Sequence, residues 1–305
     1  MSVIQIQQVS RWYGNVVAVN DVTMTIGPGV TGLLGPNGAG KSTLITMMAG
    51  FLPPSVGAVT LDGVPVWRHE AAYRHIGLVP ETEAVYDTLN GGQFVRANAE
   101  LQGLPDPGAA AAAAIDVVAM ADAADRRIST YSKGMKQRIK MAAALVHQPS
   151  VLLLDEPFNG MDPRQRLHLM ELLRQMGAEG RTVLFSSHIL EEVQQVATHI
   201  EVVVSGRHAA SGDFRTIRRL MTDRPHLYRI RSSDDRRLAA ALIGHAATSG
   251  VQLEGPAIHV QVTDFENFSR LLPGLARELG IRLWEVSPTD ESLESVFSYL
   301  VGGRA

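Results

Sequence analysis

The sequence predicts an α/β fold, a mostly parallel β-sheet covered by helices, followed by a smaller α+β module. Up to about residue 210, short β-rich runs alternate with helical patterns, which is typical of a parallel sheet covered by helices. Two runs in this part, 151–154 and 182–185, are continuously apolar, as strands buried on both faces are. Past Gly212 the composition becomes basic, and a second series of strand and helix patterns follows.

The first elements form a strand, a glycine-rich turn and a helix in succession. Early strands are expected at 3–9 and 16–26, and a short apolar run at 30–34 ends where the glycines begin. Residues 41–50 have helical composition, with Gly50 at the position where a helix is expected to stop.

A second, mainly helical layer is predicted over about residues 82–145. Helices are expected at 91–102 and 107–124, and the second contains six consecutive alanines at 109–114. Alanine favours helix more strongly than any other residue. We therefore interpret the run as part of a packed helix rather than as a low-complexity tail.

The last third of the chain predicts a separate small domain. We expect the first domain over 1–212, a linker or docking helix over the arginine-rich segment 213–226, and the second domain over 227–305. The order of patterns in the second domain resembles a ferredoxin-like α+β module. Its expected elements are a strand at 227–231, a helix at 234–244, two strands around Gly255-Pro256, a helix at 265–279, a strand at 281–286 and a helix at 291–301.

Composition limits the partners and the location. With 28 Lys and Arg against 31 Asp and Glu, the net charge of -3 gives no strong field for a polyanion, so no nucleic-acid partner is expected. The chain has no cysteine and its start shows no signal-peptide pattern, which fits a cytoplasmic protein. The uncharged stretches 22–40 and 42–61 are interrupted by glycine and proline. If the protein works at a membrane, we expect another polypeptide to cross it.

The strongest motif is the segment 35–42, GPNGAGKS, which matches G-x-x-x-x-G-K-[ST] between a predicted strand and a predicted helix. Glycines let backbone N–H groups turn inward onto phosphate oxygens, the lysine reaches the β- and γ-phosphates, and the hydroxyl supplies a Mg²⁺ ligand. A plain glycine-rich turn is the alternative, and the G-x-G-x-x-G spacing of a dinucleotide site is absent. The residues expected to hold the nucleotide are Gly35, Asn37, Gly38, Gly40, Lys41, Ser42 and Thr43.

A phosphate-binding loop alone leaves kinases, GTPases and motors open, so a second motif is needed. The apolar run 151–154 ends in Asp155 and Glu156, the form in which such ATPases present an aspartate associated with Mg²⁺. Glu156, one residue further, is placed to polarise the attacking water as a general base. The alternative is an ordinary acidic turn after a strand.

A third segment, 131–138, precedes a helix whose apolar residues Met135, Ile139, Ala142 and Val146 fall on one face. Read alone, its Ser132 is best explained as the N-cap of that helix. Beside the phosphate loop and Asp155-Glu156, the segment resembles the signature of ABC ATPases. In that family the serine and glycine, here Ser132 and Gly134, hold the γ-phosphate of ATP bound to the other subunit.

These motifs stand in the family order over residues 3–210, so the chain resembles ABC transporter ATP-binding subunits, closest in appearance to the drug-resistance and exporter type. The resemblance implies that the chain binds ATP and Mg²⁺ and that an integral membrane permease is its partner. It also implies that ATP drives the pairing of two such subunits into a homodimer, and that hydrolysis follows. It also implies a peripheral position on the inner face of the cell membrane. A soluble ABC-type ATPase acting on nucleic acid or ribosomes is the rival, disfavoured because the chain has one motif set and no sustained heptads. A module without catalysis is disfavoured because the catalytic motif residues are present.

Three further residues are placed by the resemblance. Tyr13 looks like the aromatic residue that stacks on adenine, with a surface or core aromatic as the alternative. Asp162, in the segment 159–162, looks like part of the loop that crosses the dimer interface, and it also reads as a helix N-cap before Pro163. His188 resembles the switch histidine that contacts the γ-phosphate, with an ordinary helix-start histidine as the alternative.

Two positions depart from the commonest family spelling. Glu81 stands where a glutamine is usual; its carboxylate keeps an oxygen for Mg²⁺ or water and adds a negative charge. Lys133 stands where glycine is usual in the signature, and it either points to solvent or adds a cation near phosphate. In the resulting mechanism Lys41, Mg²⁺, Ser132 and His188 stabilise charge while Glu156 handles the water.

Overall fold

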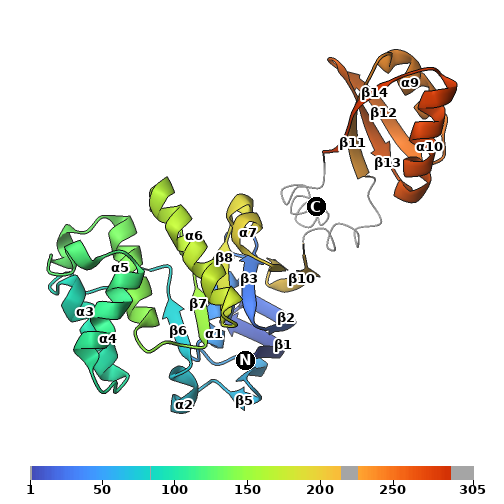
Figure 1. The fold of residues 1–305 in the computed structure, drawn as a ribbon. Helices are drawn as coiled ribbons and strands as arrows, with labels where there is room; N and C mark the ends of the chain where they lie inside the picture. The colour runs from blue at the N-terminus through green and yellow to red at the C-terminus, as the bar shows by residue number, and fades with distance from the viewer. Residues whose placement is uncertain (1, 83, 214–225, 290–305) are drawn as a thin grey trace. The chain divides into compact units, whose positions relative to one another are not determined.

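The computed structural model describes residues 2–82, 84–213 and 226–289, and the chain divides into two compact units, Met1–Asp213 and Phe214–Ala305 (Figure 1). Each unit has a hydrophobic core of its own. Within the described residues, no helix combines the length and the apolar character needed to cross a bilayer.

The first unit contains two β-sheets. The smaller sheet is antiparallel with strand order β2-β1-β4-β5. The larger has the order β10-β9-β3-β8-β7-β6, with neighbours parallel except for the edge strand β10. The strands are β1 (Ile4–Tyr13), β2 (Val16–Ile26), β3 (Gly29–Leu34), β4 (Val56–Leu61), β5 (Val64–Pro65), β6 (Ile76–Val79), β7 (Val151–Leu154), β8 (Thr182–Ser187), β9 (His199–Val204) and β10 (Arg207–Gly212).

Helix α1 (Lys41–Met48) starts directly after the glycine-rich loop and packs between the two sheets. Its buried side chains, Leu44 and Met48 among them, share one core with residues of β1, β2, β4, β7 and β8. All residues of β7 and β8 are buried, as the apolar runs 151–154 and 182–185 predict, and in β8 the burial continues over Ser186 and Ser187. The expected strand, glycine turn and helix are therefore confirmed, and α1 is fixed from both sides.

A helical layer follows β6, in green at the edge of the first unit in Figure 1. It contains α3 (Gly91–Leu101), α4 (Pro107–Val117) and α5 (Lys133–Leu145), and each packs against the other two. The short helix α2 (Glu70–Tyr73) precedes this layer, and α6 (Pro163–Ala178) and α7 (Leu190–Val196) pack against β3 and β8.

The helix expected at 107–124 is shorter than predicted. It contains the whole alanine run but ends at Val117, and Ala119 has a left-handed backbone with a φ of 53° before a 3₁₀ turn at Ala121–Ala123. Alanine propensity gave no sign of this stop, because the residues beyond it also favour helix. In α5 the buried face is also wider than the predicted stripe, since it includes Gln137 and Lys140, while Met135 is only half-buried.

The second unit has one four-stranded antiparallel sheet with the order β12-β13-β11-β14. With its two helices this is the predicted β-α-β-β-α-β arrangement. Most of the predicted linker at 213–226, namely residues 214–225, and the predicted helix at 291–301 lie outside the described residues. The elements are β11 (His226–Ser232), α9 (Asp235–Leu242), β12 (Thr248–Glu254), β13 (Ala257–Val262), α10 (Phe265–Glu278) and β14 (Leu283–Pro288).

Candidate active site

The glycine-rich loop after β3 packs so closely against neighbouring strands that side chains at two of its positions would clash. A Cβ atom on Gly35 would lie 2.3 Å from the Val203 carbonyl oxygen, and one on Gly40 would lie 2.5 Å from that of Ala18. Gly40 also has a φ of 98°, which favours glycine. A cavity of about 490 Å³ opens over this loop and the start of α1. Its lining residues are Ala18, Asn37, Gly38, Ala39, Gly40, Lys41, Ser42, Thr43, Glu81 and Glu156.

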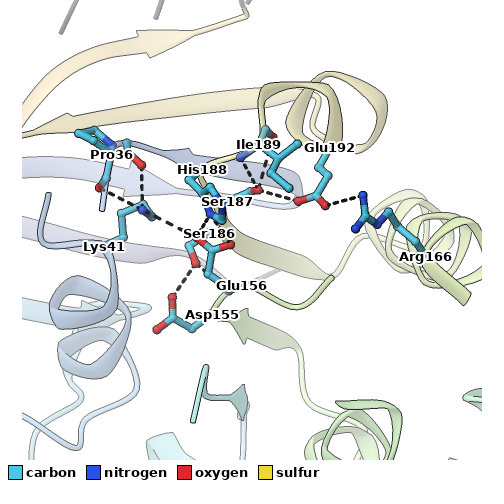
Figure 2. Close-up of polar contacts among 11 residues, drawn as sticks. Pro36, Lys41, Asp155, Glu156, Arg166, Ser186, Ser187, His188, Ile189 and Glu192 are labelled. Carbon is cyan, nitrogen blue, oxygen red and sulfur yellow. Dashed lines mark hydrogen bonds and ion pairs between the residues drawn. The ribbon is translucent and has the colours of Figure 1, made fainter. Parts of the chain in front are cut away.

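Lys41 is the cation of this cavity, and its side chain is almost wholly buried. Its ammonium group donates to the carbonyl oxygens of Gly35 and Pro36 at 2.8 and 3.2 Å (Figure 2). The ammonium nitrogen also lies 3.9 Å from the Glu156 carboxylate. Burial lowers the pKa of Lys41, against the opposing effect of the nearby carboxylates of Glu156, Asp155 and Glu81. The loop thus presents a fixed positive group where phosphate oxygens would enter.

Asp155 and Glu156 follow the last residue of β7 and are both buried. One hydroxyl fixes them, because Ser186 Oγ donates to Asp155 Oδ1 at 2.6 Å and accepts from the backbone N–H of Glu156 at 2.9 Å. Glu156 has a φ of 49°, a left-handed conformation that costs a non-glycine residue about 1–3 kcal/mol. The strained turn aims two adjacent carboxylates in different directions.

His188 follows the neighbouring strand β8 and faces Glu156 (Figure 2). Its Nδ1 lies 2.9 and 3.0 Å from the two carboxylate oxygens of Glu156. Because β7 and β8 are parallel neighbours, their carboxyl ends meet at one edge of the sheet, where open α/β sheets place their ligands. The side chain of Glu156 is therefore held between an ammonium group and an imidazole at the cavity wall.

Glu81 brings a further carboxylate to the same cavity, which Ser42 also lines. It follows β6, the parallel neighbour of β7 that ends at Val79. Within the ranges that the structure describes, no cluster of three or more His, Asp or Glu side chains is suited to hold a metal alone. The oxygen donors of Ser42, Asp155 and Glu81 fit the way proteins bind Mg²⁺, through one or two carboxylates together with substrate phosphates.

The Ser132 segment lies elsewhere, at the start of α5. Ser132 Oγ accepts from the N–H of Met135 at 3.2 Å, and Asp162 caps α6 in the same way through the N–H of Gln165 at 2.9 Å. The two helix starts are packed together, since a Cβ on Gly134 would lie 2.5 Å from Gln165 Oε1. The side chain of Lys133 lies over Gly160, where a Cβ would meet it at 2.5 Å. Ser132, Gly134 and Asp162 do not line the cavity of their own chain.

Tyr13 ends β1 and stays on the surface, with 47% of its area exposed. The Arg11 guanidinium lies over its ring, 4.9 Å from the centroid. Tyr13, like the Ser132 segment, does not line the cavity. The antiparallel sheet that contains Tyr13 contributes Ala18 of β2 to the lining. The structure thus brings Lys41, Ser42, Glu81, Asp155, Glu156 and His188 together, and keeps Tyr13, Ser132, Gly134 and Asp162 apart from them.

Comparison with known proteins decides the family. A family described as ABC transporter matches residues 19–159. The linearmycin resistance ATP-binding protein LnrL of Bacillus subtilis is 36% identical over 213 residues, which cover 68% of each chain. The Nod factor export ATP-binding protein I of Rhizobium meliloti is 32% identical over 98% of this chain and 88% of its own. This chain belongs to the ABC transporter ATP-binding proteins.

The fold agrees with this membership. A solved ATP-binding subunit of an ABC transporter superimposes on 72% of this chain and 92% of its own, with a TM-score of 0.66 and 28% identity. The ABC protein described here is therefore an ATP-binding, ATP-hydrolysing transport ATPase, and the soluble nucleic-acid or ribosomal alternative is not favoured.

Some residues of this ABC site were not found from the sequence. Ser186 joins the Asp155 carboxylate to the backbone N–H of Glu156, and Glu192 of α7 contacts Ser187 beside His188. Ser186 directly follows the apolar run 183–185 inside a fully buried strand, so a polar residue there was a usable signal. For Glu192 no local signal existed, because the adjacent Glu191 has the same side chain and is exposed.

Proposed function

We propose that this ABC protein is the motor subunit of an exporter, and that the phosphate loop, Asp155, Glu156 and His188 carry its hydrolysis step. The single observation that supports the roles best is the position of Glu156, held between Lys41 and His188 at the wall of the phosphate cavity. Export is supported by the relative named as a Nod factor export ATP-binding protein.

In this proposal the backbone of 35–40 and the Lys41 ammonium bind the β- and γ-phosphates. Ser42, Asp155 and Glu81 hold Mg²⁺, which supplies positive charge to the phosphate oxygens. Glu156 takes a proton from the attacking water. The water oxygen bonds to the γ-phosphorus while the bond from the γ-phosphorus to the ADP oxygen breaks. His188 orients Glu156 from the opposite side to Lys41 and donates to the γ-phosphate.

The remaining predicted residues act from a second copy of the chain. Ser132 caps the 13-residue helix α5 and Gly134 lies in its first turn, and neither lines the cavity of its own subunit. A homodimer that closes head to tail places them against the γ-phosphate bound by the partner, with Asp162 at the interface. Tyr13 stacks on adenine once its ring exchanges the Arg11 guanidinium for the base.

The membrane partner is an integral permease, with this subunit bound to it at the cytoplasmic face. A groove of about 220 Å³, lined by Phe51, Tyr73 and Phe94 among others, offers an apolar surface for a permease segment. It also contains Pro80, which adjoins Glu81 of the nucleotide cavity. Phe51 is 69% exposed, so the groove presents a large apolar side chain to a partner. If an affinity-tagged full chain recovers no integral membrane protein from detergent-extracted membranes, this part is wrong.

Replacement of Glu156 by Gln tests the catalytic roles. Magnesium-dependent turnover should fall by about 10²- to 10⁴-fold, the usual contribution of a general base. ATP binding should persist, because Lys41 and the loop are unchanged, and the variant should accumulate as an ATP-bound dimer in size-exclusion chromatography. Glu191→Gln, at an exposed position, is the matched control and should behave as the wild type. Vigorous hydrolysis by Glu156→Gln would contradict the assignment.

A further inference from the structure

Glu192 is a buried carboxylate that stands beside the proposed site without lining its cavity. It lies in the first turn of α7, and only 4% of its area is exposed. Its Oε2 accepts a hydrogen bond from Ser187 Oγ at 2.6 Å (Figure 2). The adjacent Glu191, in contrast, is exposed to solvent. Burying a carboxylate costs free energy unless it is paired, so we expect hydrogen-bond donors or cations around Glu192.

On one side, Glu192 fixes the residues that flank His188. Ser187 Oγ has one proton, and the 2.6 Å distance to Glu192 against 3.4 Å to the Ile189 carbonyl assigns that proton to the carboxylate. The same hydroxyl accepts from the N–H of Ile189 at 3.0 Å. The residues before and after His188 are thus tied to one oxygen, whose orientation is set by Glu192.

On the other side, Glu192 meets a cation from a different helix. Arg166 of α6 places its Nη1 3.3 Å from Glu192 Oε1, an ion pair without the alignment of a hydrogen bond. Arg166 lies one turn after the α6 cap, because its N–H donates to the Asp162 carbonyl. Burial raises the pKa of Glu192, while the Ser187 hydrogen bond and the Arg166 charge act in the opposite direction.

We propose that Glu192 is a positioning residue for ATP hydrolysis, which through Ser187 sets His188 against Glu156 and through Arg166 anchors that loop to the start of α6. The inference rests on the proposed roles of Glu156 and His188. The His188 side chain is 42% exposed, so little besides this loop and Glu156 restricts its position. Loss of alignment by about 1 Å at a reacting centre can lower a rate about 10²-fold.

The first experiment compares Glu192→Ala and Glu192→Gln with Glu191→Ala in the full chain, by steady-state ATPase assays with Mg²⁺. The alanine variant should lose about 10- to 100-fold in kcat, because its loop loses both contacts. KM for ATP should change less than about twofold, since the phosphate loop is untouched. Glu192→Gln should lose less, because its amide oxygen still accepts from Ser187, and it serves alone if the alanine variant fails to fold. Glu191→Ala should keep wild-type kinetics.

A double-mutant cycle then asks whether Glu192 acts through His188. Adding Glu192→Ala (or Glu192→Gln) to His188→Ala should lower kcat little further. Hydrogen exchange in the nucleotide-free chain gives a readout independent of activity, with faster exchange of the Ile189 amide expected in the alanine variant but not in Glu191→Ala. An unchanged kcat in Glu192→Ala, or equal losses with and without His188, would overturn the inference. Undiminished turnover in Glu156→Gln would instead overturn the proposed function itself.

Discussion

The two units of this ABC protein treat buried charge in opposite ways. In the second unit, over the described residues 226–289, the only buried polar side chain is that of Ser232, and the core is aliphatic and aromatic. In the described part of the first unit, six charged side chains are buried: Lys41, Lys140, Asp155, Glu156, Glu192 and Glu201. Such groups lower stability unless they are compensated, so their concentration in one unit calls for a physical reason.

Five of the six line the cavity over the glycine-rich loop or contact the segments around it. Lys41 and Glu156 line it, Asp155 shares Ser186 with Glu156, and Glu192 supports the loop of His188. Lys140 of α5 donates to the carbonyl oxygens of Pro80 and Thr82, both at 2.7 Å, and so fixes the segment that carries Glu81. The comparison indicates that the first unit gives up stability to place charges, whereas the described part of the second is built around apolar packing.

The largest expected effect on stability comes from the second unit. Leu238 is fully buried in the core of this unit. Its replacement by Ala should destabilise the unit by about 2–5 kcal/mol, because apolar burial is lost and a cavity is left behind. The ATPase kinetics of the folded chain should not change, because no charged side chain is buried among residues 226–289 of this unit. Segment-resolved hydrogen exchange over 226–289 measures the first effect, and a coupled ATPase assay measures the second.

Arg236→Ala, at an exposed position of the same helix, is the control for that measurement and should leave exchange unchanged. If Leu238→Ala lowered kcat while the first unit stayed protected from exchange, the claim that the core of the second unit has no effect on ATP hydrolysis would be wrong.

The sequence predicted the parts of this division that depend on local pattern. The strand, glycine loop and helix around Lys41, and the buried strand before Asp155-Glu156, follow from spacing and apolar runs, and the structure has both. It did not predict Glu192, because burial of one glutamate and exposure of its neighbour depend on α6, which is distant in sequence. The roles of Ser132, Gly134, Asp162 and Tyr13 stay predictions, because they require a second chain or a bound nucleotide.

Glu201 is the exception among the buried charges, and it gives the smallest effect. It is 1% exposed in β9, where His208 Nε2 lies 2.6 Å from Oε2, and Ser211 Oγ at 2.9 Å and His199 Nε2 at 3.2 Å face Oε1. Its cost is therefore offset by local partners on the β9–β10 hairpin rather than by a ligand. The hydrogen bond with Glu201 raises the pKa of His208, and burial acts in the opposite direction. The negative charge of Glu201 and backbone hydrogen bonds with Ala210 and Thr23 add to the rise.

The sign of the resulting pH dependence follows from linkage. A histidine with a raised pKa in the folded state contributes its full stability below its unfolded pKa of 6.5 and loses it as pH rises through the folded value. His208→Gln keeps a hydrogen-bond donor but takes no charge. Its deficit in free energy of unfolding, relative to the wild type, should thus be about 1 kcal/mol larger at pH 6 than at pH 9, measured by urea titration. His69→Gln, an exposed histidine, should show no such difference. An equal deficit at both pH values would mean that Glu201 is held by neutral hydrogen bonds alone, and that charge pairing does not offset its burial.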